Sequence, residues 1–321
     1  MTSGPRELQI SKTLTGGSGT SLASTGDACV AVEGRRASVW IADEPCQAAM
    51  LTGNEGGPVT IDADGTTARA GQWIIDLTTG QARDLGIDVE TLSAGLRFDQ
   101  RAASRFYRAG VSAPTAAGDR LVASWLFAPS RGIDDDVANP GPPGQVVLID
   151  THSRSLIAVL EQLDDLSAGP VLAVDSQRAV VATRASVRWY STEDGALVGE
   201  ETGSNSAALA IALSAGGARV AVSRADRTVA VIDLSGNSVK VAWQPHDERV
   251  HALAFHPDGG LLATGGRDRS IKLWDISSDP PREVGSFDAS DKIDALGFNP
   301  SGDELYASIG REVVVLTLEP A

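Results

Sequence analysis

Three of the four histidines in the chain follow one another at intervals of five residues. They are His246, His251 and His256, and imidazole is the commonest metal ligand in proteins. The residues around them alternate in the manner of β-strands, and a spacing of five places successive members on opposite faces of a strand. One metal ion would not reach all three, so the sequence predicts neither a metal site nor a bound cofactor.

An acidic run formed by Asp134, Asp135 and Asp136 lies within "RGIDDDVANP". It lacks the alternating ligand spacing of calcium-binding loops, and we therefore interpret it as a solvated loop. No glycine-rich phosphate loop, GxSxG elbow or HExxH pair occurs in the sequence, and these are the motifs that announce common catalytic chemistries. The sequence thus favours a protein without catalytic residues.

A basic and aromatic segment, "LRFDQRAASRFYRAG", places arginines at three- and four-residue spacing. This is helical spacing, so it predicts a short helix with one basic face; the face consists of Arg97, Arg101, Arg105 and Arg108, beside Phe106 and Tyr107. Two interpretations stay open. The helix packs its aromatic side chains on the edge of a sheet, or it presents arginine and tyrosine, which dominate binding hot spots, to a partner.

Bulk composition further narrows the classes of protein to which the chain could belong. The net charge is −15 and the apolar fraction is 42%, which argues against general binding to nucleic acid or anionic membranes and permits a substantial core. No window approaches the roughly 18 apolar residues of a membrane span, and the first ten residues do not resemble a signal peptide, so we expect a cytoplasmic protein. Cys29 and Cys46 are expected to be small buried residues.

The elements that would position these residues form a repeat. Short apolar runs of strand character end at Ala42, Asp76, Asp150, Ser191, Asp233, Asp275 and Thr317. Neighbouring ends are separated by 34, 74, 41, 42, 42 and 42 residues, and the interval of 74 is one period of 42 with about 32 inserted residues. The chain therefore contains seven copies of one unit.

One copy shows what the unit contains. Residues 250–287 hold four short strands, "VHALAF", "LLATGG", "SIKLWD" and "EVGSF", with the turn "HPDGG" between the first two. A period of 40 to 45 residues with four strands per copy is the signature of a β-propeller blade. The sequence thus predicts an all-β, seven-bladed β-propeller made of four-stranded antiparallel blades.

The same copy resembles a WD-repeat. The residues in their expected slots are His246, Val250, Phe255, Pro257, Asp258, Gly259, Thr264, Asp268, Trp274 and Asp275. The chain is similar to WD-repeat propellers of bacterial type, with one well-preserved repeat and six degenerate ones. The resemblance implies that His246, Thr264, Asp268 and Trp274 form a structural hydrogen-bonded ladder across the blade. In the preceding copy, Ser223 and Asp226 are kept, while Ile232 stands in the tryptophan slot.

The ends of the chain complement each other. After "EVVVLTLEP" the last copy is one strand short, and "RELQISKTL" near the N-terminus supplies it, because Leu8, Ile10 and Leu14 share one face at a period of two. We expect residues 6–14 to be the outer strand of the last blade, sealing the ring as in WD-repeat propellers. The whole chain, residues 1–321, is then one domain.

The resemblance also predicts a partner-binding face. In WD-repeat propellers, the loops between second and third strands, and those between successive blades, lie on one face. Here the former carry Arg35, Arg36, Arg69, Arg131, Arg184, Arg224, Arg227, Arg267, Arg269 and Arg311, which predicts a basic ring on an acidic body; pairing of these arginines with turn aspartates is the competing interpretation. Insertions at residues 86–110 and 128–144 of the third blade rise from the same face.

Together these patterns predict a non-catalytic scaffold that binds an acidic peptide or domain through this face and the third-blade insertions, as a monomer or as a subunit of a larger assembly. A hydrolase or lactonase working at the mouth of the central channel is the alternative from another class. A third possibility is that the arginines bind RNA or another anionic ligand, in which case binding weakens steeply with salt.

Overall fold

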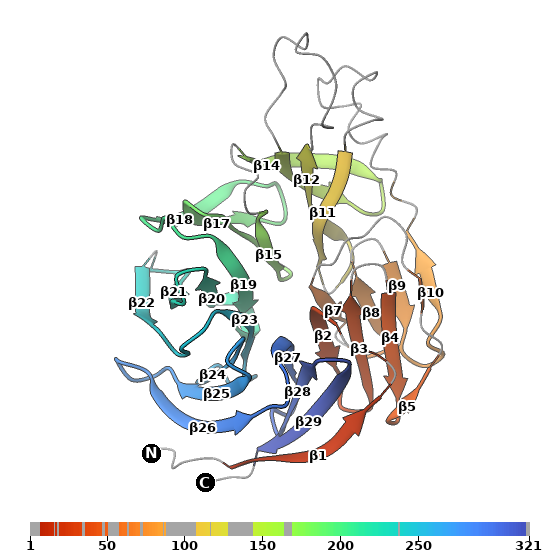
Figure 1. The fold of residues 1–321 in the computed structure, drawn as a ribbon. Coiled ribbons are helices and arrows are strands. Elements are labelled where there is room, and N and C mark those ends of the chain that lie inside the picture. Colours follow the sequence, from red (N-terminus) through yellow and green to blue (C-terminus); the bar gives the residue numbers. More distant parts are fainter. Residues whose placement is uncertain are drawn as a thin grey trace, which may run out of the picture.

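Seven antiparallel sheets are arranged in a ring around a central axis in the computed structural model (Figure 1). The structure describes residues 7–15, 17, 19–33, 36–46, 49–50, 58–62, 64–70, 73–85, 87, 107–115, 117–127, 144–163, 169–236 and 238–318. No α-helix occurs in these ranges, and one short 3-10 turn, Ala215–Gly217, precedes a second strand. The all-β propeller expected from the period is therefore confirmed.

Each blade is named here in chain order, with its strands from the inside of the ring outward. Blade 1 consists of β2 (Ser21–Ser24), β3 (Ala28–Glu33), β4 (Arg36–Ile41) and the outer pieces β5 (Glu44–Pro45) and β6 (Ala49–Met50). Blade 2 consists of β7 (Val59–Ile61), β8 (Thr67–Ala70), β9 (Trp73–Asp76) and β10 (Ala82–Asp84). Blade 3 consists of β11 (Tyr107–Pro114), β12 (Arg120–Phe127), β13 (Gly144–Asp150) and β14 (Ser155–Leu163).

Blades 4 to 7 follow the same order. Blade 4 consists of β15 (Val171–Val174), β16 (Arg178–Ala182), β17 (Ser186–Ser191) and β18 (Leu197–Thr202), and blade 5 of β19 (Ala208–Leu213), β20 (Arg219–Arg224), β21 (Val229–Asp233) and β22 (Ser238–Trp243). Blade 6 consists of β23 (Val250–Phe255), β24 (Leu261–Gly266), β25 (Ser270–Asp275) and β26 (Arg282–Asp288). Blade 7 consists of β27 (Ile293–Phe298), β28 (Glu304–Ile309), β29 (Glu312–Leu318) and, outermost, β1 (Leu8–Leu14).

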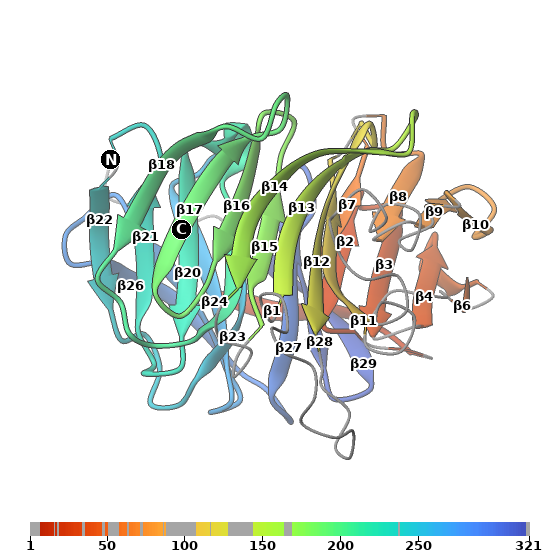
Figure 2. The same cartoon turned by 90° about the horizontal axis from the view of Figure 1, so that it is seen from above.

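The core is divided among the junctions of the ring. Seven apolar clusters are formed by the described residues. Six lie between two neighbouring blades, and the seventh packs Ile87, from the segment after β10, against β12 and β13 of blade 3. The alternation of the middle strands explains this arrangement, because successive side chains of a strand face opposite neighbours. Burial of apolar surface at every junction makes the ring a rigid platform for the loops at its two ends, which Figure 2 shows edge-on.

The N-terminal strand closes the ring as expected. Strand β1 pairs antiparallel with β29, from Leu8 opposite Leu318 to Leu14 opposite Val313. The expectation that Leu8, Ile10 and Leu14 share a face is wrong. A register shift between Ile10 and Lys12 turns Leu14 into the cluster between blades 7 and 1, whereas Leu8 packs between blades 6 and 7 and Ile10 is 54% exposed.

The third blade differs from the sequence prediction at its first insertion. Tyr107 and Arg108 open strand β11, where they pair with Phe127 and Leu126, so the predicted helix does not extend to them and the insertion ends before Gly110. Pairing within the sheet prevails over the local helical spacing. The second insertion ends where β13 begins at Gly144. Arg97, Arg101, Arg105, Phe106, Asp134, Asp135 and Asp136 lie outside the described residues.

Candidate partner-binding face

The hydrogen-bonded ladder in blade 6 links its middle strands to the loop that enters the blade. Trp274 Nε1 donates to Thr264 Oγ1 at 3.0 Å, and Thr264 Oγ1 lies 2.7 Å from His246 Nε2. His246 Nδ1 lies 2.9 Å from an Asp268 carboxylate oxygen, and Ser270 Oγ donates to the same carboxylate. The structure therefore brings together all four residues that the resemblance implied.

Protonation states follow from this geometry. Burial lowers the pKa of His246, so the ring is neutral near pH 7, donates from Nδ1 and accepts from Thr264 at Nε2. Burial of Asp268 is outweighed by His246 and by Ser270, and these partners lower the pKa of the carboxyl group. The ionised carboxylate in turn fixes the turn between β24 and β25, in which Arg267 and Arg269 point away from the blade and are exposed.

Blade 4 retains the tryptophan of the ladder and lacks its acceptor. Trp189 pairs with Val180 as Trp274 pairs with Leu262, and two positions along, Ala182 stands where blade 6 has Thr264. Trp189 is fully buried, and its Nε1 has no hydrogen-bond partner among the described residues. This tryptophan thus keeps its packing role while its polar atom remains unsatisfied.

Blade 5 replaces the ladder with an arginine. Arg224 is 4% exposed, and its Nη1 donates to the carbonyl oxygens of Ser206 (3.1 Å) and Thr183 (3.4 Å), while Glu201 lies 3.7 Å from Nη2. Arg224 was expected to bind a partner, but this burial commits its side chain to bridging blades 4 and 5. Ser223, assigned from sequence to the ladder slot, instead donates to the carbonyl oxygen of Val250 in blade 6 at 2.9 Å.

We call the face formed by the β24–β25 turn and its counterparts, together with the loops between blades, the upper face. Three of its exposed arginines hold neighbouring loops together. Arg184 Nε donates to Asn205 O at 3.3 Å, Arg227 Nη1 to Asp247 O at 2.9 Å, and Arg249 Nε to Ala225 O at 3.2 Å. These bonds join consecutive loops around the rim.

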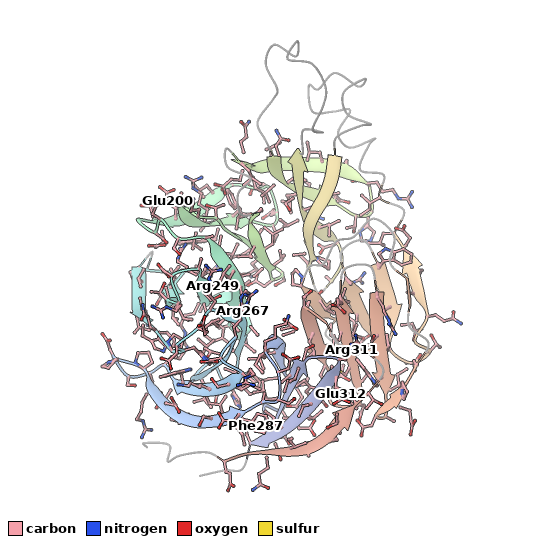
Figure 3. The ribbon with its side chains drawn as sticks, in the orientation of Figure 1. Glu200, Arg249, Arg267, Phe287, Arg311 and Glu312 are labelled. Atoms are coloured by element: carbon pink, nitrogen blue, oxygen red, sulfur yellow. The ribbon has the colours of Figure 1, made fainter. Side chains whose placement is uncertain are left out.

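Three other arginines of the upper face are free of such contacts. Arg267, Arg269 and Arg311 are exposed, and no described residue forms a hydrogen bond or ion pair with their guanidinium groups. They come from the adjacent blades 6 and 7, on which Figure 3 labels Arg267 and Arg311. We call these three residues the arginine trio.

The upper face is mixed in charge, which corrects the expectation of a continuous basic ring. Exposed carboxylates share its loops; they are Asp247, Glu248, Asp288, Asp291 and Glu312. Arg69, also assigned to this face, lies inside β8 and donates to Ala117 O at 3.2 Å, in a turn at the opposite end of the blades. The free positive charge on the described part of this face is therefore local, at blades 6 and 7.

The three histidines considered as metal ligands occupy separate places. His246 belongs to the ladder, His251 lines the central channel, and His256 lies in the turn at the other end of blade 6, with its Nε2 at 3.0 Å from Gly302 O. Among the described residues, no group of three or more His, Cys, Asp or Glu side chains could hold a metal ion. In the same ranges, no helix is long and apolar enough to cross a membrane.

Comparison with known proteins identifies one repeat directly. The family described as "WD domain, G-beta repeat" matches residues 236–275. The chain is 32% identical to Small ribosomal subunit protein RACK1 of Neurospora crassa and 31% identical to MST50-interacting protein 11 of Pyricularia oryzae, in each case over 94 residues that cover 29% of both chains. It is 28% identical to Protein groucho of Drosophila melanogaster over 178 residues, 55% of this chain and 23% of that protein.

These matches cover less than a third of each of the three relatives. The relatives come from eukaryotes, so they give no support to the expectation of a bacterial-type protein. The family match spans the outer strand of blade 5 and the first three strands of blade 6, where the complete ladder lies. The chain is a seven-bladed β-propeller that contains a WD40 repeat.

Proposed function

We propose that this propeller is a non-catalytic scaffold that binds an acidic peptide or domain of another protein through its upper face. The observation that carries the proposal is the arginine trio, three exposed cations without partners among the described residues on two adjacent blades. Exposed arginines are frequent anchors of protein interfaces, because they combine charge with several directed donors. Their position on loops held by the rigid ring reduces the entropy lost on binding.

The names of the relatives agree with this function. One is a component of the small ribosomal subunit and another is named as an interacting protein, which fits a chain that works inside an assembly or as a separate binding partner. The insertions of the third blade, with Arg97, Arg101, Arg105, Phe106, Tyr107, Arg108 and Asp134 to Asp136, add specificity to the same surface. Residues 1–321 act as one domain in the cytoplasm.

The arginines that donate to neighbouring loops stabilise the shape of the upper face. Arg184 and Arg227 donate to carbonyl oxygens of the next loop and keep the rim in shape around the arginine trio. Because the net charge is −15, a long polyanion such as RNA meets general repulsion, whereas a short acidic segment meets mainly the local field of blades 6 and 7. This difference favours a protein partner.

The proposal is tested by reversing the charge of the arginine trio. Arg267, Arg269 and Arg311 are changed together to Glu, and capture of proteins from the native lysate is compared with wild type. The control reverses three cations elsewhere on the ring, Arg154, Lys240 and Arg282, which gives the same net charge. We expect an identified partner to be captured by wild type and control and lost from the trio variant.

A second variant isolates the insertion. Arg97, Arg101 and Arg105 are changed to Glu, and the affinity of the identified partner is measured by titration calorimetry at two salt concentrations. Weakening by tenfold or more assigns the insertion to the interface. Equal affinity of the trio variant and wild type for that partner would contradict the proposal, and turnover of a substrate at the channel mouth would replace it with the hydrolase alternative.

A further inference from the structure

The inner strands of three consecutive blades each contain an extra residue at the same level. Pairing with the second strand shifts register between Ala208 and Ala210, between Val250 and Ala252, and between Ile293 and Ala295. The residues in between are Leu209, His251 and Asp294, and all three line the central channel. Bulges of this kind redirect side chains and are over-represented next to functional sites.

The channel at this level is a cavity of about 340 Å³ lined by the inner strands of six blades. Most of the residues that line it are aliphatic, among them Leu22, Val59, Leu172, Ile211, Leu253 and Leu296, while polar atoms make up about half of the exposed wall. The size and the mixture of apolar and polar lining are those of a small-ligand pocket. A ligand that fits it has a short apolar body and one polar head.

His251 is the polar group that the structure leaves incomplete. Its Nε2 atom is enclosed by protein and has no hydrogen-bond partner among the described residues. A buried ring nitrogen without a partner is unfavourable. Because His251 lines the channel, a ligand that induced rotation of the imidazole about its Cβ–Cγ bond would satisfy that nitrogen. Burial, together with the positive charge of Arg267, lowers the pKa of His251, so the ring is neutral and able to donate one hydrogen bond.

The charged groups around His251 determine whether an anionic or a cationic ligand is favoured. Arg267, Lys292 and Arg249 all oppose protonation of His251, and Asp294 alone favours it. Asp294 is already paired with Lys292 at 2.8 Å, and Arg267 has no partner among the described side chains. Because Lys292 neutralises Asp294, Arg267 and Arg249 remain as the net positive charge beside this histidine at the upper end of the channel, and this charge attracts an anion.

We propose that the upper end of the central channel is a binding site for a carboxylate group on a short aliphatic chain. The carboxylate accepts a hydrogen bond from Nε2–H of His251 and lies in the field of Arg267, while its methylene groups contact the aliphatic wall. The same chemistry has two sources, a free short-chain organic acid or a glutamate side chain of a bound protein. The site differs from the arginine trio in needing His251 and the channel wall.

The test titrates the full chain with glutarate, and in parallel with a capped pentapeptide that carries one central glutamate. The same peptide with glutamine in that position is the control ligand. Two variants address the site, His251→Phe, which keeps the ring and removes both nitrogens, and Arg267→Gln. Their matched controls are His152→Phe and Arg154→Gln, at an exposed histidine and an exposed arginine of blade 3.

Calorimetry measures affinity, and NMR of the histidine ring protons reports on His251 directly. We expect binding of at least one carboxylate ligand, weakened tenfold or more in both site variants and unchanged in both controls, with the pKa of His251 rising on saturation. Binding of glutarate alone identifies a free acid, and binding of the glutamate peptide identifies a protein segment.

Absence of binding by both ligands, or equal affinity in His251→Phe and wild type, would overturn the proposal. A melting temperature within a few degrees of wild type confirms that the variant is folded, and we expect this result because Nε2 of His251 has no hydrogen-bond partner among the described residues. If the arginine-trio variant loses its protein partner while neither glutarate nor the glutamate peptide binds, the scaffold function stands and the channel site alone is refuted.

Discussion

Replacement of Thr264 by valine would test whether the ladder stabilises the blade through hydrogen bonds or only through packing. Valine has nearly the same shape, so little cavity forms, but the hydroxyl group that accepts from Trp274 Nε1 and donates to His246 Nε2 is removed. Thr264 is fully buried, and Trp274 and His246 are 8% and 5% exposed. Water therefore does not replace the missing partner at either nitrogen.

The expected loss is large relative to the stability of a protein domain. Each buried polar group left without a partner costs about 1–3 kcal/mol, and two such groups give roughly 2–6 kcal/mol out of a usual total of about 5–15 kcal/mol. Equilibrium unfolding in urea, followed by tryptophan fluorescence and checked for reversibility, measures the difference. Thr202→Val, at an exposed threonine at the end of β18, is the surface control and is expected to change stability by less than about 0.5 kcal/mol.

The reverse substitution is available in blade 4. Ala182→Ser places a hydroxyl group where Trp189 Nε1 now lacks an acceptor, and it is expected to stabilise the protein by about 1 kcal/mol. If Thr264→Val costs no more than the surface control, the ladder contributes only packing. If Ala182→Ser gives no gain, the register argument that equates Ala182 with Thr264 is refuted.

Three further outcomes follow from contacts elsewhere in the ring. Arg224→Gln leaves Glu201 and two carbonyl oxygens without their buried donor and should destabilise the protein by about 3 kcal/mol in urea unfolding. Hydrogen bonds from Ser235 lower the pKa of Asp233, so its stabilising effect is complete above its unfolded pKa of about 3.9 and is lost as pH falls below that value; Asp233→Asn should therefore reduce the difference in unfolding free energy between pH 5 and pH 2.5. Gly302→Ala adds a methyl group that overlaps His256, whereas Gly216→Ala, at a similar positive φ, meets open space, so differential melting should show the first to be the more damaging.

Much of the fold could be predicted from the sequence because its information is periodic. The third strands of blades 3 to 7 repeat every 41 or 42 residues, and each of the seven third strands was found in a sheet of its own. The ladder residues were located because Trp274 and Asp275 stand in the best-preserved copy. Closure by the N-terminal strand was predictable from the missing strand in the last copy.

Other features depend on packing that the period does not contain. A single extra residue near Ser11 moves Leu14 to the other side of β1, and no apolar alternation reveals such a shift. Burial of Arg224 was missed because the sequence pattern assigned this residue to an exposed turn. In the structure its side chain is buried and occupies the space that the His246 ring fills in blade 6. His251 was considered from the sequence only as a metal ligand, whereas as the extra residue of β23 it lines the channel.

Basic side chains join neighbouring blades at both ends of the ring, and we call the face opposite the upper face the lower face. At the lower face, side chains of one blade donate to backbone oxygens of the next at several junctions: Arg120 to Thr192 O at 3.2 Å, Arg178 to Gly217 O, and Tyr306 to Gly26 O at 3.3 Å. His256 and Gly302 make the same kind of contact between blades 6 and 7. These side chains hold neighbouring blades together, so their removal would destabilise the ring.

The guanidinium groups of the arginine trio make no such contact within the described part of the chain. Closure rests on the lower-face bonds, the apolar junctions and the β1–β29 pairing, so changing Arg269 or Arg311 to alanine should leave the melting temperature within about 1–2 °C of wild type. Loss of partner binding without loss of stability would place these arginines in an interface. A melting temperature lowered by 5 °C or more would show instead that they stabilise the loops, and the scaffold proposal would lose the observation on which it rests.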